Sequence, residues 1–577
     1  MSNPIAGRWP ARYYLFMLSL FVLALVPRLY SAQTLGWDWY GPGSFTLVNF
    51  DEGGSCRAAL DGFDYSGLVG RQTVAIAGLL GAGPEAGIVG DTAAVKAYCH
   101  SPAHLLVARM FSALTGAMTV VALCVIALLL VPATPAIAWT AGALLALSGF
   151  HISESHSATV DAPSVFFIYS FLAWMVFASV TRSRLAMLIS PLFLVPAVWA
   201  KYWVFALFAY GAWLPQRLWG FLSSGISARR LVAIVVGTAL LFGLLGNSAF
   251  QRLGLYPLLG LYYLLIPWQR IKRPMIVFWL LVPVVAYLLC RIDLIAAYTM
   301  GSMSGRFGTS YGAIGWHKWL RNLLNVPLVL AVGLGLPALV FILSGIRNAM
   351  RALPHDGEKL RGWLCLLPVV AFVLFMAFVA PVTYYRHYLA LLPAGALLAA
   401  YGLHTTRWGS RPWFLALFFA WPALLAWDLV VDYHHDPRRQ LPAWFQAHPN
   451  ARVFTSFYVN PPPVTAGNLR LFRPEYAQGD AAALRQADYL ILSENWYDTA
   501  FANELNGPLT DDLSQLVKTT AQAAQFYRAA VRNEHPYLQL EQRLAVENYM
   551  PELWLHKRFY GTFQLFVGDL RIYRVLR

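Results

Sequence analysis

Long apolar segments separated by short polar connections constrain this chain more than any other feature. Of its 577 residues, 58% are hydrophobic and only 12% are charged, which is too little charge to cover the surface of a water-soluble globule. Apolar runs of about 20 residues are long enough to cross the hydrocarbon core of a bilayer as α-helices. The sequence therefore predicts a polytopic α-helical membrane protein.

About thirteen apolar segments are candidates for membrane-spanning helices, although several are shorter than about 20 residues. The first follows Arg8 and Arg12, and we interpret it as a retained signal anchor because no small-x-small cleavage site follows it. In chain order the segments are 13–30, 105–131, 136–150, 162–180, 185–199, 202–218, 231–245, 253–266, 275–290, 323–344, 363–380, 388–403 and 413–431.

The placement of Lys and Arg predicts the orientation of these segments. Cations gather in alternate connections, at 182–184, 217–230, 270–273, 347–361 and 407–411. Cytoplasmic loops of membrane proteins carry such an excess of cations, so we expect a multi-pass inner-membrane protein with a cytoplasmic N-terminus. The first loop (32–104), a later loop (291–320) and the tail after residue 431 are then extracytoplasmic. The net charge of +15 needs no nucleic-acid partner to explain it.

Composition changes after residue 431, which predicts a transmembrane domain over 1–431 and a small extracytoplasmic, periplasmic α/β domain over 432–577. Within the second domain, the apolar run 489–492 predicts a buried strand and the amphipathic pattern near 511–531 predicts a helix. The alternating runs 563–567 and 570–573 predict a terminal hairpin that turns at Gly568 and Asp569.

Two adjacent acids, Asp51 and Glu52, stand near the start of the first loop. In so apolar a chain they are the leading candidates for catalytic carboxylates, with one acting as a general base on an acceptor hydroxyl or amine while the other supports it. The alternative interpretation is a solvated acidic turn. The same loop contains mildly amphipathic pieces, such as 69–80, that predict short interfacial helices.

Two of the five cysteines, Cys56 and Cys99, lie in this first loop. An extracytoplasmic loop allows them to form a disulfide. Two unpaired buried thiols are an equally good interpretation of the sequence alone.

The second outer connection, 151–163, contains an unusual density of polar side chains, including His151, His156 and Asp161. Such density beside lipid is costly unless the side chains line a wet cavity, so these three residues are candidate substrate-binding groups. Asp161 can instead cap the following helix, which has proline at an early position. A metal held by the two histidines lacks further His or Cys ligands at a suitable spacing.

Cations on the outer side need an explanation, because the positive-inside bias leaves that side poor in them. An anionic phosphate is a natural partner for Lys201 and Arg386, whereas the alternative is that both snorkel to lipid headgroups. Their aromatic and imidazole neighbours Tyr202, His387 and Tyr388 are further candidate binding residues.

The outer loop 291–320 interleaves glycines with Arg306, aromatic residues and His317. It is a candidate lid over a bound carrier lipid, with Arg306 as a candidate contact, or an ordinary connector. It contains no phosphate-loop motif.

Several short motifs, in this order along the chain, resemble the GT-C superfamily of membrane glycosyltransferases. The resemblance is to the branch that contains the dolichyl-phosphate-mannose protein mannosyltransferases and the lipid A aminoarabinose transferase. It extends to the extracytoplasmic terminal domain and covers most of the chain. The motifs are Asp51-Glu52, 108–116, 155–163 and 385–393.

This resemblance implies an inverting transfer of a single hexosyl or pentosyl unit from a polyprenyl phosphate, such as undecaprenyl phosphate, to a glycolipid such as lipid A or to a protein. It implies Asp51 as the general base with Glu52 beside it in the pocket, and Asp161 as the second-loop acid that supports substrate binding. Lys201 and Arg386 would hold the donor phosphate, which leaves as a dianion. Because the first loop has no Asp-x-Asp motif, we expect no cofactor and metal-independent transfer, with a divalent metal left open.

Two other functions fit an apolar chain with outer cations. A transporter or flippase for lipid-linked glycans is expected to show internal repeats and ionisable groups at mid-membrane, and this sequence shows neither. A glycan polymerase or ligase would use the same carrier lipid with another acceptor.

Overall fold

The computed structural model describes the chain over 14 stretches. The expected spans at 231–245, 253–266 and 275–290 lie outside them, as do Tyr202, Arg306 and the outer loop up to residue 315. The described residues are 9–49, 51–63, 65–201, 203, 206, 209, 316–352, 362–378, 385–456, 458–461, 469–471, 481–497, 521–546 and 568–577.

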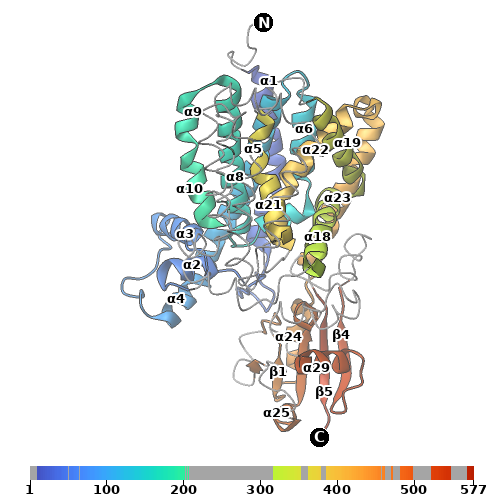
Figure 1. Cartoon of the computed structure of the whole chain (residues 1–577). Helices are drawn as coiled ribbons and strands as arrows, with labels where there is room; N and C mark the ends of the chain where they lie inside the picture. Colours follow the sequence, from blue (N-terminus) through green and yellow to red (C-terminus); the bar gives the residue numbers. More distant parts are fainter. Residues whose placement is uncertain are drawn as a thin grey trace, which may run out of the picture.

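A bundle of apolar helices forms the larger part of the described structure (Figure 1). Within the described stretches, four helices are long and apolar enough to cross a membrane, or up to six if each of two bent pairs counts as one span. Among them, α5 (Pro102–Leu130) packs against both α1 (Ala11–Thr34) and α8 (Asp161–Thr181) around a continuous apolar core. The prediction of a helical membrane protein is thus confirmed, and the total of about thirteen spans stays a prediction.

Two of the expected spans are each broken into two helices at a sharp bend. The segment 136–150 ends as α6 (Ala136–Ala146), and α7 (Gly149–Ser155) continues at an angle of 59°. The break falls at Ser148, whose hydroxyl accepts a hydrogen bond from the His151 N–H and caps the new helix.

The segment 323–344 is instead a helical hairpin of α18 (Trp316–Leu334) and α19 (Leu336–Ala352), bent by 120°. Gly335 lies at the bend with φ +87°, a conformation that L side chains rarely adopt. Segment 185–199 is likewise interrupted at Ser190, between α9 (Arg184–Ile189) and α10 (Pro191–Ala200).

The remaining helices of the bundle agree with the expected apolar segments to within a few residues. A short 3-10 helix, η5, precedes α22 and carries the expected cation Arg386. In order, the elements are α21 (Leu367–Phe378), η5 (Tyr385–Tyr388), α22 (Leu391–His404), η6 (Arg407–Ser410) and α23 (Pro412–His434).

The described residues of the first loop form three short helices, and a disulfide joins the first of these helices to the last. These are α2 (Gly54–Leu60), α3 (Leu68–Leu79) and α4 (Thr92–Cys99). The disulfide joins Cys56 to Cys99, which decides between the two interpretations of these cysteines, and the helix expected over 69–80 is confirmed as α3. All three helices lie at the same end of the bundle as the carboxyl-terminal sheet (Figure 1).

The carboxyl-terminal part begins with η7 (Pro437–Gln440) and α24 (Leu441–Ala447) and contains a five-stranded sheet of order β2-β1-β3-β5-β4. β1 runs parallel to both β2 and β3, whereas β5 is antiparallel to β3 and β4. The strands are β1 (Val453–Thr455), β2 (Leu469–Leu471), β3 (Tyr489–Ser493), β4 (Leu538–Leu544) and β5 (Leu570–Val575), and the helices beside them are α25 (Ala481–Arg485), α26 (Glu494–Tyr497) and α29 (Ala521–Val531).

The strand expected at 489–492 is confirmed as β3, and α29 is the described part of the helix expected near 511–531. Of the expected terminal hairpin, residues 563–567 lie outside the described stretches, and 570–573 are part of β5. A strand has two edges, and those of β5 are already paired, with β3 on one side and β4 on the other. The division of the chain at residue 431 stays a prediction, since α23 continues to His434.

Candidate active site

A tight turn presents the two first-loop acids. The side chain of Asn49 accepts a hydrogen bond from the Asp51 N–H at 3.0 Å, and the backbone of Asn49 accepts one from Glu52. Gly53 then takes a φ of +81°, and a Cβ there would lie only 2.5 Å from the ring of His100. Glycine is therefore required directly after the acids, and adjacent side chains in this turn reach different surroundings.

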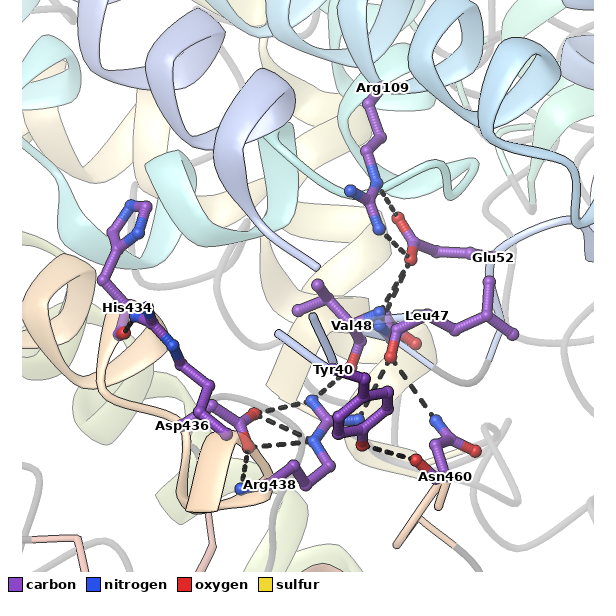
Figure 2. A network of polar contacts seen from close by, with 11 residues as sticks. Tyr40, Leu47, Val48, Glu52, Arg109, His434, Asp436, Arg438 and Asn460 are labelled. Atoms are coloured by element: carbon purple, nitrogen blue, oxygen red, sulfur yellow. Dashed lines mark hydrogen bonds and ion pairs between the residues drawn. The ribbon is translucent and has the colours of Figure 1, made fainter. Parts of the chain in front are cut away.

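Glu52 points into the protein and is 1% exposed. Arg109 of α5 binds it with two hydrogen bonds, from Nε to Oε1 at 2.6 Å and from Nη2 to Oε2 at 2.7 Å (Figure 2). Backbone N–H groups of Val48 and Asn49 donate to Oε2, and that of Ala158 donates to Oε1. Both carboxylate oxygens of Glu52 therefore accept hydrogen bonds from other groups of the protein.

The interactions of Glu52 correct one expectation. Burial alone would raise the pKa of its carboxyl, but the charge and hydrogen bonds of Arg109 and the backbone donors hold that pKa below its usual value. We expected Glu52 to stand in the pocket beside Asp51, whereas the structure makes it the anchor that joins the first loop to α5 and to the 156–160 connection. Arg109 had no expected role, although a lone arginine in an apolar span is itself a signal.

Asp51 lies on the other side of the turn and forms an ion pair with Arg386 of η5. Its side chain keeps 26% of its surface exposed, against 10% for Arg386. Burial alone would lower the pKa of the Arg386 guanidinium, but the carboxylates of Asp51 and Asp161 raise it well above its usual value. Of the two adjacent acids, Asp51 is the one that a substrate can reach.

A second ion pair joins Asp161, the first residue of α8, to Lys201, which directly follows α10. The expected alternative, that Asp161 caps α8, is wrong, because the cap is Val160 and no side chain caps the helix there. Asp161 also lies close enough to Arg386 and His387 for their charges to interact with its own. The two ion pairs are therefore one cluster built from four separate parts of the chain.

Glu154 belongs to this cluster and was not among the expected site residues. It is 2% exposed, and its Oε2 atom has no hydrogen-bond partner within the described stretches. Its charge interacts with those of Asp51, Asp161, Lys201 and Arg386. An acid in the polar connection 151–163 was a visible signal, but that segment alone does not say which of its side chains face the cations.

Two other expected binding residues, His151 and Tyr388, form contacts with groups outside the cluster. The Nδ1 atom of His151 lies 2.9 Å from Nη2 of Arg28, inside the helix bundle. Arg28 also donates to the carbonyls of Ala146 and Leu145, at the break between α6 and α7. The hydroxyl of Tyr388 donates to the Asn322 carbonyl at 3.1 Å, and the side chain is fully buried. His151 and Tyr388 thus support the site rather than line it.

His156 packs edge-on against Tyr433, with ring centroids 4.9 Å apart. Burial, together with the charge of Arg109, lowers the pKa of His156 to about 3, so its imidazole is neutral near pH 7. Neither ring nitrogen has a hydrogen-bond partner in the part of the chain that the structure describes. Over the same residues, no group of three His, Cys, Asp or Glu side chains is arranged to hold a metal ion.

Chemically, the cluster combines an accessible carboxylate with two cations and two further acids. Asp51 can accept a proton, and Arg386 and Lys201 can stabilise an anionic oxygen. The cluster lies where the first loop, the start of α8, the end of α10 and η5 meet.

Known proteins give little further guidance. No protein-family model and no curated protein matches the chain. Solved structures that are similar to it at low identity include three of an archaeal oligosaccharyltransferase from Archaeoglobus fulgidus. The structure of AglB with an inhibitory peptide and a dolichol-phosphate shares 10% identity over 89% of this chain and 72% of that chain, with a TM-score of 0.42. The apo form shares 11% over 89% and 70%, with a TM-score of 0.44.

The third structure, tethered to an acceptor peptide, shares 10% identity over 89% of this chain and 72% of that chain, with a TM-score of 0.43. Similarities this distant do not establish a function. The resemblance to the GT-C superfamily therefore remains one of motifs, and the functional argument rests on the residues of the cluster.

Proposed function

We propose that the protein is an inverting glycosyltransferase of the inner membrane. It moves a single hexosyl or pentosyl unit from a polyprenyl-phosphate carrier to a glycolipid or protein acceptor at the extracytoplasmic face. The observation that carries the proposal is the cluster itself, in which the accessible carboxylate of Asp51 stands beside the two cations Arg386 and Lys201. The carboxyl-terminal sheet also lies at the same end of the helix bundle as the first-loop helices (Figure 1).

In the proposed reaction, Asp51 accepts the proton of the acceptor hydroxyl or amine while the acceptor oxygen or nitrogen attacks the anomeric carbon of the sugar. The bond between that carbon and the phosphate oxygen breaks on the opposite face, which inverts the configuration. The polyprenyl phosphate leaves with one more negative charge, and Arg386 and Lys201 stabilise it. The proton ends on Asp51 and is returned to water.

Both cations are paired with carboxylates in the structure. Binding of the donor phosphate supplies new oxygens for Arg386 and Lys201, so it competes with Asp51 and Asp161 for them. We propose that this exchange releases the Asp51 carboxylate for the acceptor. Because positive charge is already present, we also propose that the transfer proceeds without a resident metal.

The test is transfer by purified protein supplied with a panel of polyprenyl-phosphate sugars and acceptors, with Asp51→Asn compared to wild type. A general base typically contributes about 10²–10⁴-fold, so turnover should fall at least about 100-fold. The donor should not bind more weakly, because the amide that replaces the Asp51 carboxylate no longer competes with the phosphate for Arg386. Glu85→Gln is the matched control, since it removes one exposed acid from the same loop. Wild-type turnover in Asp51→Asn would rule out the base. Movement of the lipid-linked sugar across vesicles without covalent transfer would instead support the flippase.

A further inference from the structure

Arg438 is a buried arginine at the point where the chain leaves α23 and enters the carboxyl-terminal part. It lies in η7 and is 7% exposed. Its Nε lies 2.9 Å from Asp436 Oδ1, and its Nη2 lies 2.6 Å from Asp436 Oδ2. The ring of Trp39 lies 5.1 Å from its guanidinium carbon. The carboxylate of Asp436, two residues earlier in the sequence, thus neutralises the charge of Arg438.

The same guanidinium reaches the first loop with its remaining donors. Nη1 donates to the Leu47 carbonyl at 3.1 Å, and Nη2 donates to the Val48 carbonyl at 3.4 Å (Figure 2). Asn460 adds a second contact to the Leu47 carbonyl at 3.4 Å, and its own carbonyl accepts a hydrogen bond from the Tyr40 hydroxyl at 2.6 Å. The carboxyl-terminal part therefore holds the backbone carbonyls of residues 47 and 48.

Glu52 binds backbone N–H groups of residues 48 and 49, next to the carbonyls that Arg438 binds. Its Oε2 atom accepts hydrogen bonds from the N–H groups of Val48 at 3.1 Å and Asn49 at 3.3 Å. The side chain of Asn49 in turn accepts a hydrogen bond from the Asp51 N–H, so the placement of residues 47–49 sets the position of Asp51. Arg438 and Glu52 fix this stretch from its two sides.

We propose that Arg438 is a positioning residue for Asp51, acting through the 47–49 backbone, a role that rests on the function proposed above. A general base must lie within hydrogen-bond reach of the proton that it takes, and a misplacement of about 1 Å can cost about 10²-fold in rate. The pair of Asp436 and Arg438 is complete without the first loop. The contacts to Leu47 and Val48 are additional, and they connect the carboxyl-terminal part to the catalytic turn.

The decisive variant is Arg438→Lys. Lysine keeps the charge beside Asp436, so the buried carboxylate retains a partner, but one ammonium lacks the planar fork that reaches both the carboxylate and two carbonyls. Arg439→Gln is the matched control, because Arg439 is the next residue and its side chain is exposed. Transfer kinetics, the donor Kd and amide hydrogen exchange of the peptide containing residues 47–50 are measured on the full-length protein.

We expect Arg438→Lys to lower kcat about 10- to 100-fold while the donor Kd stays within about threefold. Exchange at Val48 and Asn49 should accelerate at least about tenfold with unchanged protection of α5, because the held backbone opens locally. Arg439→Gln should match wild type in every measurement. In an Asp51→Asn background, Arg438→Lys should reduce the residual rate by no more than about twofold, because the two changes act through the same group.

Wild-type kcat and exchange in Arg438→Lys would overturn the proposal. An equal loss of rate in the Asp51→Asn background would also overturn it, since Arg438 would then act on something other than Asp51. Hydrogen exchange separates this failure from failure of the proposed function. If wild type transfers no sugar while exchange still accelerates in Arg438→Lys, the contact exists but its catalytic role falls with the function.

Discussion

Asp51 and Glu52 are neighbours in sequence, yet the structure predicts opposite consequences when their charges are removed. Glu52→Gln keeps the shape of the side chain but removes a carboxylate that is 1% exposed. That carboxylate accepts hydrogen bonds from two nitrogens of Arg109 and from the N–H groups of Val48, Asn49 and Ala158. An amide turns one acceptor atom into a donor, so some of these donors lose their acceptor.

The loss in the free energy of unfolding depends on the buried groups that Glu52→Gln leaves without an acceptor, namely the Arg109 guanidinium and backbone N–H groups. Removing one partner of a buried ion pair costs about 3–5 kcal/mol, because the other charge is left uncompensated, and a stranded backbone donor costs about 1–3 kcal/mol. Even about 3 kcal/mol is a large share of the about 5–15 kcal/mol that holds a typical domain folded. We expect Glu52→Gln to lower the melting temperature by several degrees.

The assay is thermal unfolding in detergent micelles, followed by intrinsic fluorescence, for wild type, Glu52→Gln, Asp51→Asn and Glu85→Gln. The side chain of Asp51 is 26% exposed, so Asp51→Asn should shift the melting temperature less than Glu52→Gln while abolishing transfer. An unchanged melting temperature in Glu52→Gln would refute the anchoring role of this ion pair. A larger shift in Asp51→Asn would refute the division of roles between the two acids.

The pH dependence tests the same ion pair. The pKa of Glu52 is lower in the folded protein than its usual value of about 4.3, so its contribution to stability is complete above that value. The contribution is lost as the pH falls through the lower, folded-state pKa. The difference in melting temperature between wild type and Glu52→Gln should therefore be constant from about pH 6 to 8 and shrink only below about pH 4.

Three further predictions concern the other residues of the cluster and the disulfide of the first loop. Lys201→Gln should raise the Kd for a polyprenyl phosphate about 10- to 100-fold, because it removes a charge-assisted hydrogen bond of about 1.5–3 kcal/mol, and a Kd equal to wild type would show that Lys201 does not hold the phosphate. Glu154→Gln should tighten the same binding, since it removes a negative charge beside the two cations, whereas weaker binding would mean that the carboxylate itself contacts the donor. Serine at both Cys56 and Cys99 opens a cross-link over 43 residues, worth about 4 kcal/mol in the chain-entropy model, so limited proteolysis should cut within α2–α4 faster than in wild type, and equal rates would contradict it.

Hydropathy and local spacing predicted much of this molecule. Apolar length located helices such as α1, α5 and α23, because a bilayer span needs a continuous apolar run. Hydropathy averaged over a span of residues cannot detect a single residue that changes the direction of the backbone, so the bends at Ser148 and Gly335 were not predicted. The candidates Asp51, Asp161, Lys201 and Arg386 do meet in one cluster. The pattern of Lys and Arg predicted this grouping, because it assigned all four residues to the same side of the membrane.

Partners that are distant in sequence could not be predicted. Arg109 and Glu52 are 57 residues apart, and Arg438 and Leu47 are 391 residues apart, so no local pattern records either contact. Both arginines were visible as charges, but only the fold decides which carboxylate or carbonyl each one meets. For the same reason, sequence reasoning paired Glu52 with Asp51 rather than with α5.

Arg28 gives the first helix a role beyond that of a membrane anchor. Its guanidinium closes the gap in the backbone hydrogen bonding where α6 stops and α7 starts, and it also holds His151. The start of α7, the helix that carries Glu154, is thus in contact with the side chain of Arg28 from α1. A generic hydrophobic anchor exchanged for residues 11–34 would still deliver the chain to the membrane, but it would leave that junction without its donor. The helix that we expect to anchor the chain is also part of what assembles the bundle.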